Sequence, residues 1–409
     1  MARSWKSRRF LSVILAVALF FCVAAPVSAT EPEKAEETGT ADFVAAAEGE
    51  IGGYALSPDF SALVFSSILP RAEADASCTW NERTQVASCI PTYDLSGSLN
   101  GCVLNLQTDG AATGYMVYSF SGAEACLVQF GYDGVYCVQG EVLKAPQAGE
   151  KVLFVGLDTY LKEKNGNYYD LSSGTALQKA QLAEARLQMA ESAMRTAELG
   201  ENPAALRAAR SAGQTRQVVY EAVDVKNLWY PDFVPFTRYS IAQDDYHCAP
   251  IAAMNLMKYW KTKRGINNLY VAGQERAEFL LISYYMGTDW DGTNHWEAYT
   301  GFQQYLTKKG KPAASSCYYQ QYADWNWMTN MVQNSRPFVF IANLVYYTNS
   351  AGKTYPDGKI HSFLGTGYQE CSDGDYIRVC DGYSTNLSNF YNWGWTDRDF
   401  KGMWYYAWG

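Results

Sequence analysis

The sequence predicts an α+β protein, in which a sheet-rich domain precedes a domain that begins with helices and ends in an antiparallel sheet. Three observations lead to this class. Apolar and polar residues alternate over residues 53 to 172, an Ala-rich helical stretch follows, and helical and then strand patterns fill an aromatic-rich segment from 218 onward. With 409 residues, the chain is long enough for two domains.

The first residues, "MARSWKSRRFLSVILAVALFFCVAAPVSAT", have a basic head, an apolar run from Phe10 to Ala25, and small residues before a cleavage site after Ala29. This pattern predicts a signal peptide over residues 1–29. The apolar run is short for a membrane span, and no later run is long enough. We therefore expect a protein that is secreted or held at the cell surface and does not bind the membrane itself. Residues 30–52 are acidic and Ala-rich, which predicts a flexible leader.

Charge and cysteine content exclude some classes of partner and cofactor. The net charge is −9 and no basic patch is visible, which argues against nucleic acid and anionic membranes as partners. Of 10 cysteines, nine remain without Cys22 of the signal peptide, so in an oxidising compartment at least one thiol stays unpaired. The cysteines between 78 and 137 predict a disulfide framework of open connectivity. The cysteines and three scattered histidines show no metal-ligand spacing, so we expect no metal or organic cofactor.

The segment from 53 to 174 reads as a small sheet-rich domain. Its runs "GCVLNLQTDGAATGYMVYSF" and "ACLVQFGYDGVYCVQGEVL" are interrupted by Asp-Gly, which is typical of hairpins between antiparallel strands. Residues 175–217 are rich in Ala, Leu, Glu, Gln and Arg, stop at Gly200 and resume after Pro203, which predicts an exposed helical connector. A protease could cut this connector. It could equally be an ordinary interdomain linker.

Residues 218–409 form the second predicted domain. A helix is expected from 249 to about 264, with Pro250 in its first turn and Gly265 closing it. Cys248 then lies at the helix N-terminus. Farther along, "PFVFIANLVYY" and "KIHSFLGTGYQECSDGDYIRVCDGY" are expected as strands.

Cys248 has three interpretations: a buried structural thiol, half of a disulfide, or a nucleophile. The positive end of a helix favours the thiolate, which is the reactive form. Among the three histidines, His247 is adjacent and points away on a helix, and His295 lies in a polar stretch that suits a surface or capping role. His361 opens one strand and Asp381 ends the next. The carboxylate of Asp381 could therefore hold the imidazole of His361 in one tautomer while that imidazole accepts a thiol proton.

The register of that hairpin decides whether the pair can meet. A tight turn on Asp373-Gly374 places Asp381 opposite Thr366. Pairing Asp381 with His361 instead requires a wider loop centred on Cys371, or a bulge.

These residues resemble a known family. The runs "HCAPIAAMNLMKYW", "HSFLGTGY" and "NFYNWGW" are similar to papain-like cysteine peptidases of bacteria, especially the streptopain family and the peptidases that process bacteriocin leaders. The resemblance covers roughly 218–409 and implies a papain-like fold. It implies Cys248 as nucleophile, His361 as general base and acid, Asp381 as the orienting third residue, and Gln243 as a donor to the oxyanion hole. Asn392, in the Trp-Gly-Trp segment, is the alternative third residue.

The resemblance also bears on the first half of the chain. Streptopain-like enzymes are made as zymogens with an N-terminal inhibitory domain, and "GYMVYSF" and "YYDLSSGT" are similar to such prodomains. The first half would then be a detachable inhibitor of the second. The alternative is a permanent adhesion or binding module.

The sequence thus leads to one expectation with two alternatives. The expectation is a secreted bacterial zymogen of a cysteine peptidase that hydrolyses peptide bonds in peptide or protein substrates through a thioester. The same three residues could serve acyl transfer to an amine, as in a transglutaminase. A papain-like fold could also persist in a non-catalytic binding protein at the cell surface.

Overall fold

The computed structural model describes residues 50–51, 54–55, 58–121, 124–138, 141–172, 174–199, 218–219, 247–269, 271–289, 292–311, 317–320, 324–344, 347–348, 354–355, 359–371, 373–383, 388–396 and 400–406. The predicted signal peptide, most of the predicted leader, the end of the predicted connector and Gln243 lie outside these residues.

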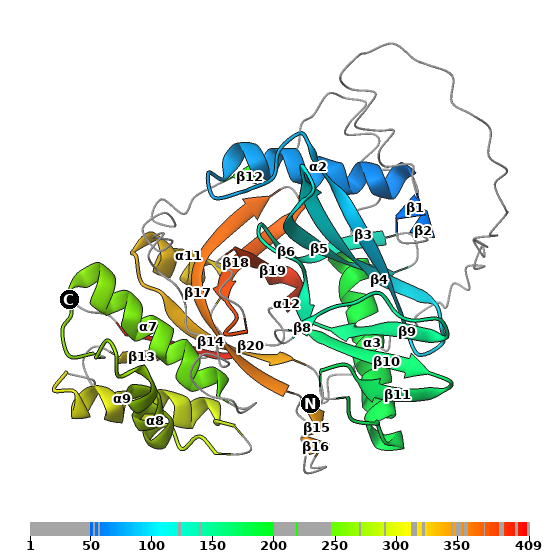
Figure 1. Cartoon of the computed structure of the whole chain (residues 1–409). Helices are drawn as coiled ribbons and strands as arrows, with labels where there is room; N and C mark the ends of the chain where they lie inside the picture. The colour runs from blue at the N-terminus through cyan, green and yellow to red at the C-terminus, as the bar shows by residue number, and fades with distance from the viewer. Residues whose placement is uncertain are drawn as a thin grey trace, which may run out of the picture.

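A large mixed sheet runs through both halves of the chain (Figure 1). Its first-half strands are β3 (Thr84–Tyr93), β4 (Leu99–Thr108), β5 (Ala111–Ser121), β6 (Glu124–Gly131), β9 (Glu150–Gly156), β10 (Thr159–Lys164) and β11 (Asn167–Asp170). The others are β12 (Val218–Val219), β13 (Cys317–Gln320), β14 (Phe338–Leu344), β17 (Lys359–Cys371), β18 (Gly374–Cys380), β19 (Asn389–Asn392) and β20 (Phe400–Tyr406). Three further pairs join β1 (Glu50–Ile51) to β2 (Tyr54–Ala55), β7 (Cys137–Val138) to β8 (Glu141–Val142) and β15 (Tyr347–Thr348) to β16 (Thr354–Tyr355).

The strand order is β11-β10-β9-β3-β4-β5-β6-β19-β18-β17-β14-β20-β13, and β12 also pairs with β17. Neighbouring strands are antiparallel except β3 and β9, which run parallel. The junction between the halves is the pair β6–β19, in which Phe390 lies opposite Phe130. The two predicted domains therefore share one sheet.

Turn chemistry explains the first-half hairpins. Asp109 and Gly110 both have positive φ, 53° and 80°, between the paired ends of β4 and β5. The dipeptide Asp-Gly favours this two-residue turn, so the hairpin predicted at this position is confirmed. Asn165 and Gly166 make the equivalent turn between β10 and β11, with φ of 55° and 76°.

Two helices flank the first-half strands. Helix α2 (Pro58–Ala74) was not predicted, although a proline at the first helical position favours a helix start. Its Leu63, Val64 and Ile68 pack in one core with residues of β4, β5 and β6. The second helix, α3 (Lys179–Leu199), coincides with the predicted connector. It contacts β5, β6 and β9 and buries one face, so it is not the exposed connector that we expected.

A layer of helices covers the end of the sheet that is formed by strands of the second half, such as β14, β17 and β20. It contains α7 (Cys248–Arg264), α8 (Glu275–Tyr285) and α9 (His295–Lys308), and the shorter helices α11 (Trp325–Gln333) and α12 (Trp393–Thr396) lie between strands. The predicted end of α7 is confirmed, because Gly265 has φ 63° and its N–H bonds to Trp260 O. Residues 251–257 are all buried, since α7 lies between the sheet and the other two helices.

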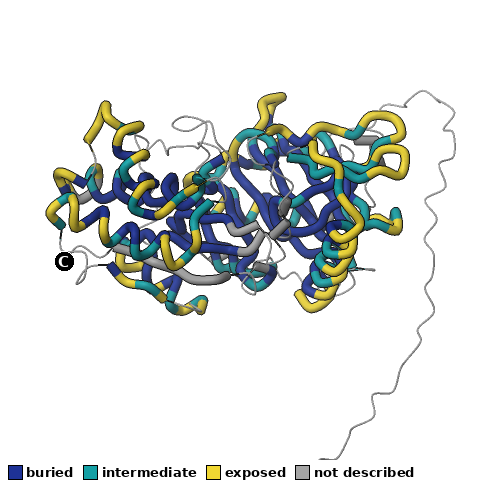
Figure 2. Tube along the Cα trace, turned by 90° about the horizontal axis from the view of Figure 1, so that it is seen from below, coloured by how far each residue is buried: buried dark blue, intermediate teal, exposed yellow. Residues whose placement is uncertain are grey.

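The hydrophobic core also joins the two halves. One buried cluster contains Val117 and Phe154 of the first half together with Ile251 and Phe363 of the second. Figure 2 shows buried segments in both halves of the molecule. None of the nine cysteines that the structure describes is part of a disulfide, so the expected disulfide framework is not formed in it.

Candidate active site

Cys248 is the first residue of α7 and is half-buried. The predicted position of this thiol at a helix N-terminus is therefore confirmed. His247 precedes the helix, makes no side-chain capping bond, and lies with its ring 5.0 Å from that of Phe279. His247 therefore packs against α8 of the helical layer.

His361 lies near the start of β17, opposite Ala342 of β14. Its side chain is only 3 % exposed. The imidazole stacks on the ring of Tyr383 with 4.5 Å between centroids and 13° between planes, and the edge of Phe363 meets it from another side at 4.5 Å. These aromatic contacts hold the ring in one orientation.

The hydrogen bonds of His361 define its tautomer. Nε2 lies 2.6 Å from the backbone oxygen of Asp381, which can only accept, so Nε2 carries the proton. Nδ1 lies 3.0 Å from the hydroxyl of Tyr383, which donates to it. In neutral imidazole the two nitrogens differ in this way, and the partner of one decides the role of the other. Nδ1 is therefore the nitrogen with a lone pair, the one that can accept a proton.

The carboxylate of Asp381 supports this arrangement indirectly. Its Oδ1 accepts the backbone N–H of Tyr383 at 2.9 Å, and its Oδ2 accepts Nδ2 of Asn389 at 2.8 Å. The first of these bonds closes an Asx-turn over Gly382, whose φ of 76° suits glycine. Asp381 and His361 thus meet as predicted, but through the backbone carbonyl, while the carboxylate folds the turn that presents it.

This turn lies against the helix that carries Cys248. A Cβ added to Gly382 would come within 3.4 Å of Cγ2 of Ile251, in the first turn of α7, and α7 also contacts β17. The histidine, the Asp381–Tyr383 turn and the start of the cysteine helix therefore occupy one corner of the second half.

The observed register differs from both predicted hairpins. Cys371 pairs with Gly374 across a tight turn, and a bulge at Thr366 shifts the pairing so that Leu364 lies opposite Cys380. Extending this register places Asp381 opposite Phe363, two residues from His361. The bulge thus brings Asp381 one residue closer to the position opposite His361. The side chain of His361 spans the remaining distance along the sheet and reaches the backbone oxygen of Asp381.

Asn392 lies elsewhere in the sheet. It is opposite Tyr376, which is itself opposite Gln369, eight residues along β17 from His361 and therefore about 25 Å away. Its Oδ1 accepts the N–H of Trp395 at 3.1 Å, and its Nδ2 donates to Leu127 O at 3.0 Å. Asn392 caps α12 and binds the first half, so its amide is occupied away from His361.

Two residues of this corner were not predicted. Tyr383 follows Asp381 in the run "CDGY", and the Asx-turn typical of Asp-Gly could have pointed to it. Asn389 had no local signal, because only the pairing of β19 with β18 brings it beside Asp381. Gln243, the predicted oxyanion donor, lies outside the described residues.

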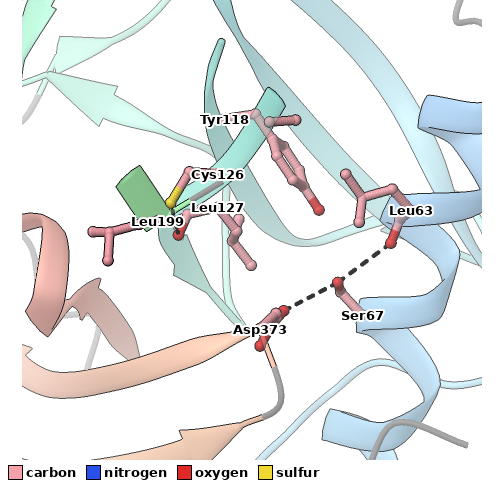
Figure 3. A pocket seen from close by; sticks show the side chains of 8 residues that line it. Leu63, Ser67, Tyr118, Cys126, Leu127, Leu199 and Asp373 are labelled. Carbon is pink, nitrogen blue, oxygen red and sulfur yellow. Dashed lines mark hydrogen bonds between the residues drawn. The ribbon is translucent and has the colours of Figure 1, made fainter. Parts of the chain in front are cut away.

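A small cavity lies away from this corner, beside the β17–β18 turn (Figure 3). Its volume is about 10 Å³, roughly the size of one water molecule. Ser67 Oγ lies 3.3 Å from Leu63 O and 3.2 Å from Oδ2 of Asp373 at its edge. The cavity is too small for a peptide.

The chain matches no model of a known protein family, and no curated protein is significantly similar to it. Among the described residues, no helix is both long and apolar enough to cross a membrane. The same residues contain no group of three or more histidine, cysteine or carboxylate side chains that could hold a metal ion.

Proposed function

We propose that the chain is an exported cysteine peptidase of the zymogen type, with Cys248 as nucleophile and His361 as general base and acid. The tautomer of His361 carries this proposal. Its Nε2–H is bound to Asp381 O, which leaves the lone pair of Nδ1 as the proton acceptor. A base held in this way, next to a helix that begins with a half-buried cysteine, suits thiol activation.

The reaction follows from these groups. Nδ1 of His361 takes the proton of Cys248, and the thiolate attacks the carbonyl carbon of the scissile peptide bond. The backbone N–H of Cys248 and, by resemblance, Gln243 stabilise the oxyanion. The imidazolium then protonates the leaving amine, which gives a thioester. Water attacks the thioester carbon and its proton passes to Nδ1. The C–S bond then breaks, which releases the acid product, and Nδ1 returns the proton to the Cys248 sulfur.

The described conformation suits a latent enzyme. Tyr383 donates its hydroxyl proton to the same Nδ1 lone pair that must accept the thiol proton, and His361 is almost fully buried. In this proposal, the uncut connector helps to hold the latent state, and cleavage between 200 and 217 activates the chain. Tyr383 must leave Nδ1 before the thiol proton can be transferred.

The test compares residues 30–409 with the Cys248→Ala and His361→Ala variants. Each protein is incubated with mild reductant at several pH values, while its intact mass and its labelling by a thiol-reactive peptide probe are followed. We expect only the wild type to be cut near 200–220 and to react at Cys248. Equal cleavage of wild type and Cys248→Ala would point to a contaminating protease. An inert Cys248 in chains nicked by an added protease would overturn the proposal in favour of a binding protein.

The acceptor of the acyl group needs a separate measurement. The proposed thioester could pass to an amine instead of water, as in a transglutaminase. A peptide substrate incubated with a primary amine distinguishes the two by product mass. We expect free acid as the main product, and amide as the main product would reassign the chain to acyl transfer.

A further inference from the structure

The junction between the halves has the character of a single core. The backbone of β6 pairs with that of β19, and Phe130 and Phe390 stack across the pair with 4.7 Å between centroids and 10° between planes. Phe390 and Tyr376 of the second half belong to the same buried cluster as the α2 residues. Removing the first half would expose both the backbone edge of β19 and this apolar face. An exposed edge of this kind invites aggregation.

A chain of buried hydrogen bonds also crosses the junction and ends at the candidate site. Nδ2 of Asn389 donates to Asp381, and Oδ1 of Asn389 accepts the hydroxyl of Tyr115 at 3.1 Å. The Tyr115 hydroxyl in turn accepts Nε2 of Gln129 at 3.2 Å. Burial, and then the charges of Asp381 and Asp158, raise the pKa of Tyr115 well above its usual value. Its hydroxyl therefore keeps its proton and donates it to Asn389.

A second set of hydrogen bonds crosses the junction, with its donor in the second half and its acceptor in the first. The hydroxyl of Tyr391, on β19, donates to Oδ2 of Asp158 at 2.8 Å, and Tyr136 donates to Oδ1 at 3.1 Å. All three side chains are buried. Separation of the halves would leave the Asp158 carboxylate without its bond from Tyr391, and a buried polar group that loses a partner is costly.

Two more contacts tie the helices of the first half to the second. Arg71 of α2 forms an ion pair with Asp373 at 2.9 Å, and both side chains are almost fully buried. Arg195 of α3 donates to Trp395 O at 3.1 Å, and Trp395 stacks on Phe154. The two halves are therefore held together by an ion pair, hydrogen bonds and stacked rings, which lie on different helices and strands.

We propose that the first half, residues 58–199, stays bound to the second half after the connector is cut, and that Tyr115 is a positioning residue for Asp381. The active enzyme is then a two-chain complex, and its first chain is a permanent part of the site. The association does not depend on peptidase activity. The positioning role of Tyr115 rests on the proposed function.

The association is tested in the full chain, with Cys248→Ala to prevent self-cleavage and a site for a specific protease inserted between 200 and 217. After cutting, the mass is measured by size-exclusion chromatography with light scattering. We expect both fragments to elute together at the mass of the uncut chain, and to remain together on 100-fold dilution. Two separate peaks of folded fragments in native buffer would overturn the proposal.

A matched pair of variants locates the contact. Phe390→Ala removes a fully buried ring at the junction, whereas Phe279→Ala removes a buried ring from the helical layer. In the cut protein, we expect Phe390→Ala to release fragments at least tenfold more readily on dilution than Phe279→Ala does. Equal release would show that the junction is not what holds the complex together. If Phe390→Ala fails to fold, Tyr391→Phe replaces it, with Tyr305→Phe as its control.

The positioning role has its own readout. Tyr115→Phe keeps the ring and loses the bond to Asn389. Tyr305→Phe instead loses a hydroxyl of α9 that bonds Leu269 O and Glu278. We expect Tyr115→Phe to lower kcat about 3- to 10-fold with KM unchanged, and Tyr305→Phe to leave kcat unchanged. An unchanged kcat in Tyr115→Phe overturns the positioning role. A wild type without turnover overturns the proposed function instead, and the elution result still decides the association.

Discussion

The corner around His361 and the junction between the halves use similar side chains, but they draw them from different distances along the chain. In the corner, His361 contacts partners 20 and 22 residues away. At the junction, Tyr115 reaches Asn389 over 274 residues and Arg71 reaches Asp373 over 302. A hairpin can form the first set by itself, whereas the second set requires both halves to be folded together.

This difference separates the residues proposed to carry out the reaction from the residues that hold them in position. The groups proposed to move protons lie on one hairpin and one helix of the second half. The groups that keep the Asp381 turn in place extend through Asn389 into the first half. Substitutions at the junction should therefore change stability most, and substitutions in the corner should change reactivity most.

The largest expected effect is at the buried ion pair. Burial opposes the charge of Arg71, but Asp373 and other nearby groups still raise its pKa above the usual value, so it remains a cation. Arg71→Met leaves Asp373 buried without its charge partner, and we expect the free energy of unfolding to fall by about 3–5 kcal/mol. Urea denaturation measures this change.

The matched control is Arg83→Met, because Arg83 and its partner Asp109 are 63 % and 55 % exposed. We expect a change of about 0.5 kcal/mol or less from that variant. The double variant Arg71→Met/Asp373→Asn should recover most of the loss. Similar losses from Arg71→Met and Arg83→Met would contradict the special role of the junction.

The next effect concerns how Asp381 acts. If its backbone carbonyl orients the imidazole, Asp381→Asn keeps that contact, and only the bond to Asn389 is lost. We expect kcat to fall about 10- to 100-fold. A carboxylate bonded directly to the imidazole would instead cost about 10⁴-fold. The swap Asp381→Asn/Asn389→Asp reverses the donor and the acceptor, so steady-state kinetics should show recovery in the double variant.

Alkaline pH provides a third test. Burial is the first cause that raises the pKa values of Tyr115, Tyr136 and Tyr391 well above their usual range. Below about pH 10 these tyrosines are protonated in both the folded and the unfolded state, and above it only the unfolded state loses the protons. Stability is therefore present below pH 10 and falls as pH rises, by about 1.4 kcal/mol per pH unit for each tyrosine.

Urea denaturation between pH 9 and 11 measures that slope. Tyr391→Phe should reduce the slope of the free energy of unfolding against pH by the contribution of one ionising tyrosine. Arg83→Met should leave this slope unchanged. A slope that is the same in wild type and Tyr391→Phe would mean that Tyr391 ionises in the folded protein.

A smaller change is expected from Tyr383→Phe. This variant keeps the ring stacked on His361 but removes the hydroxyl that donates to Nδ1. We expect Cys248 to react with a thiol reagent about 3- to 10-fold faster, because one hydrogen bond no longer competes for the lone pair. Tyr299→Phe, in the helical layer, is the control. Slower labelling in Tyr383→Phe would indicate that the hydroxyl helps to position the imidazole.

The smallest effect is expected at the β17–β18 turn, where Asp375 lies opposite Glu370. Partial burial, and then the charge of Glu370, raise the pKa of Asp375. A raised carboxyl pKa contributes stability at low pH that is lost as pH rises through the folded value. Asp375→Asn should therefore stabilise the protein at pH 7 by about 0.2–1 kcal/mol and change little at pH 3. Calorimetry at both pH values checks this.

Local sequence was sufficient where a structure depends on neighbouring residues. The Asp109-Gly110 turn and the end of α7 at Gly265 follow from the φ angles that these residues tolerate. Helix α2 was missed because its start was read as the first part of a sheet-rich segment. The packed face of α3 was missed because its buried positions include polar residues such as Gln181 and Thr196, which give no apolar stripe.

The sequence pointed to Cys248, His361 and Asp381 as candidate site residues, because residue type, helix position and strand order are local properties. Tertiary structure decided how they are held. The bulge at Thr366 sets which atoms of Asp381 reach the imidazole, and the pairing of β6 with β19 brings Tyr115 to Asn389. Strand register and pairing between distant segments depend on the packing of the whole sheet, and no short stretch of residues encodes them.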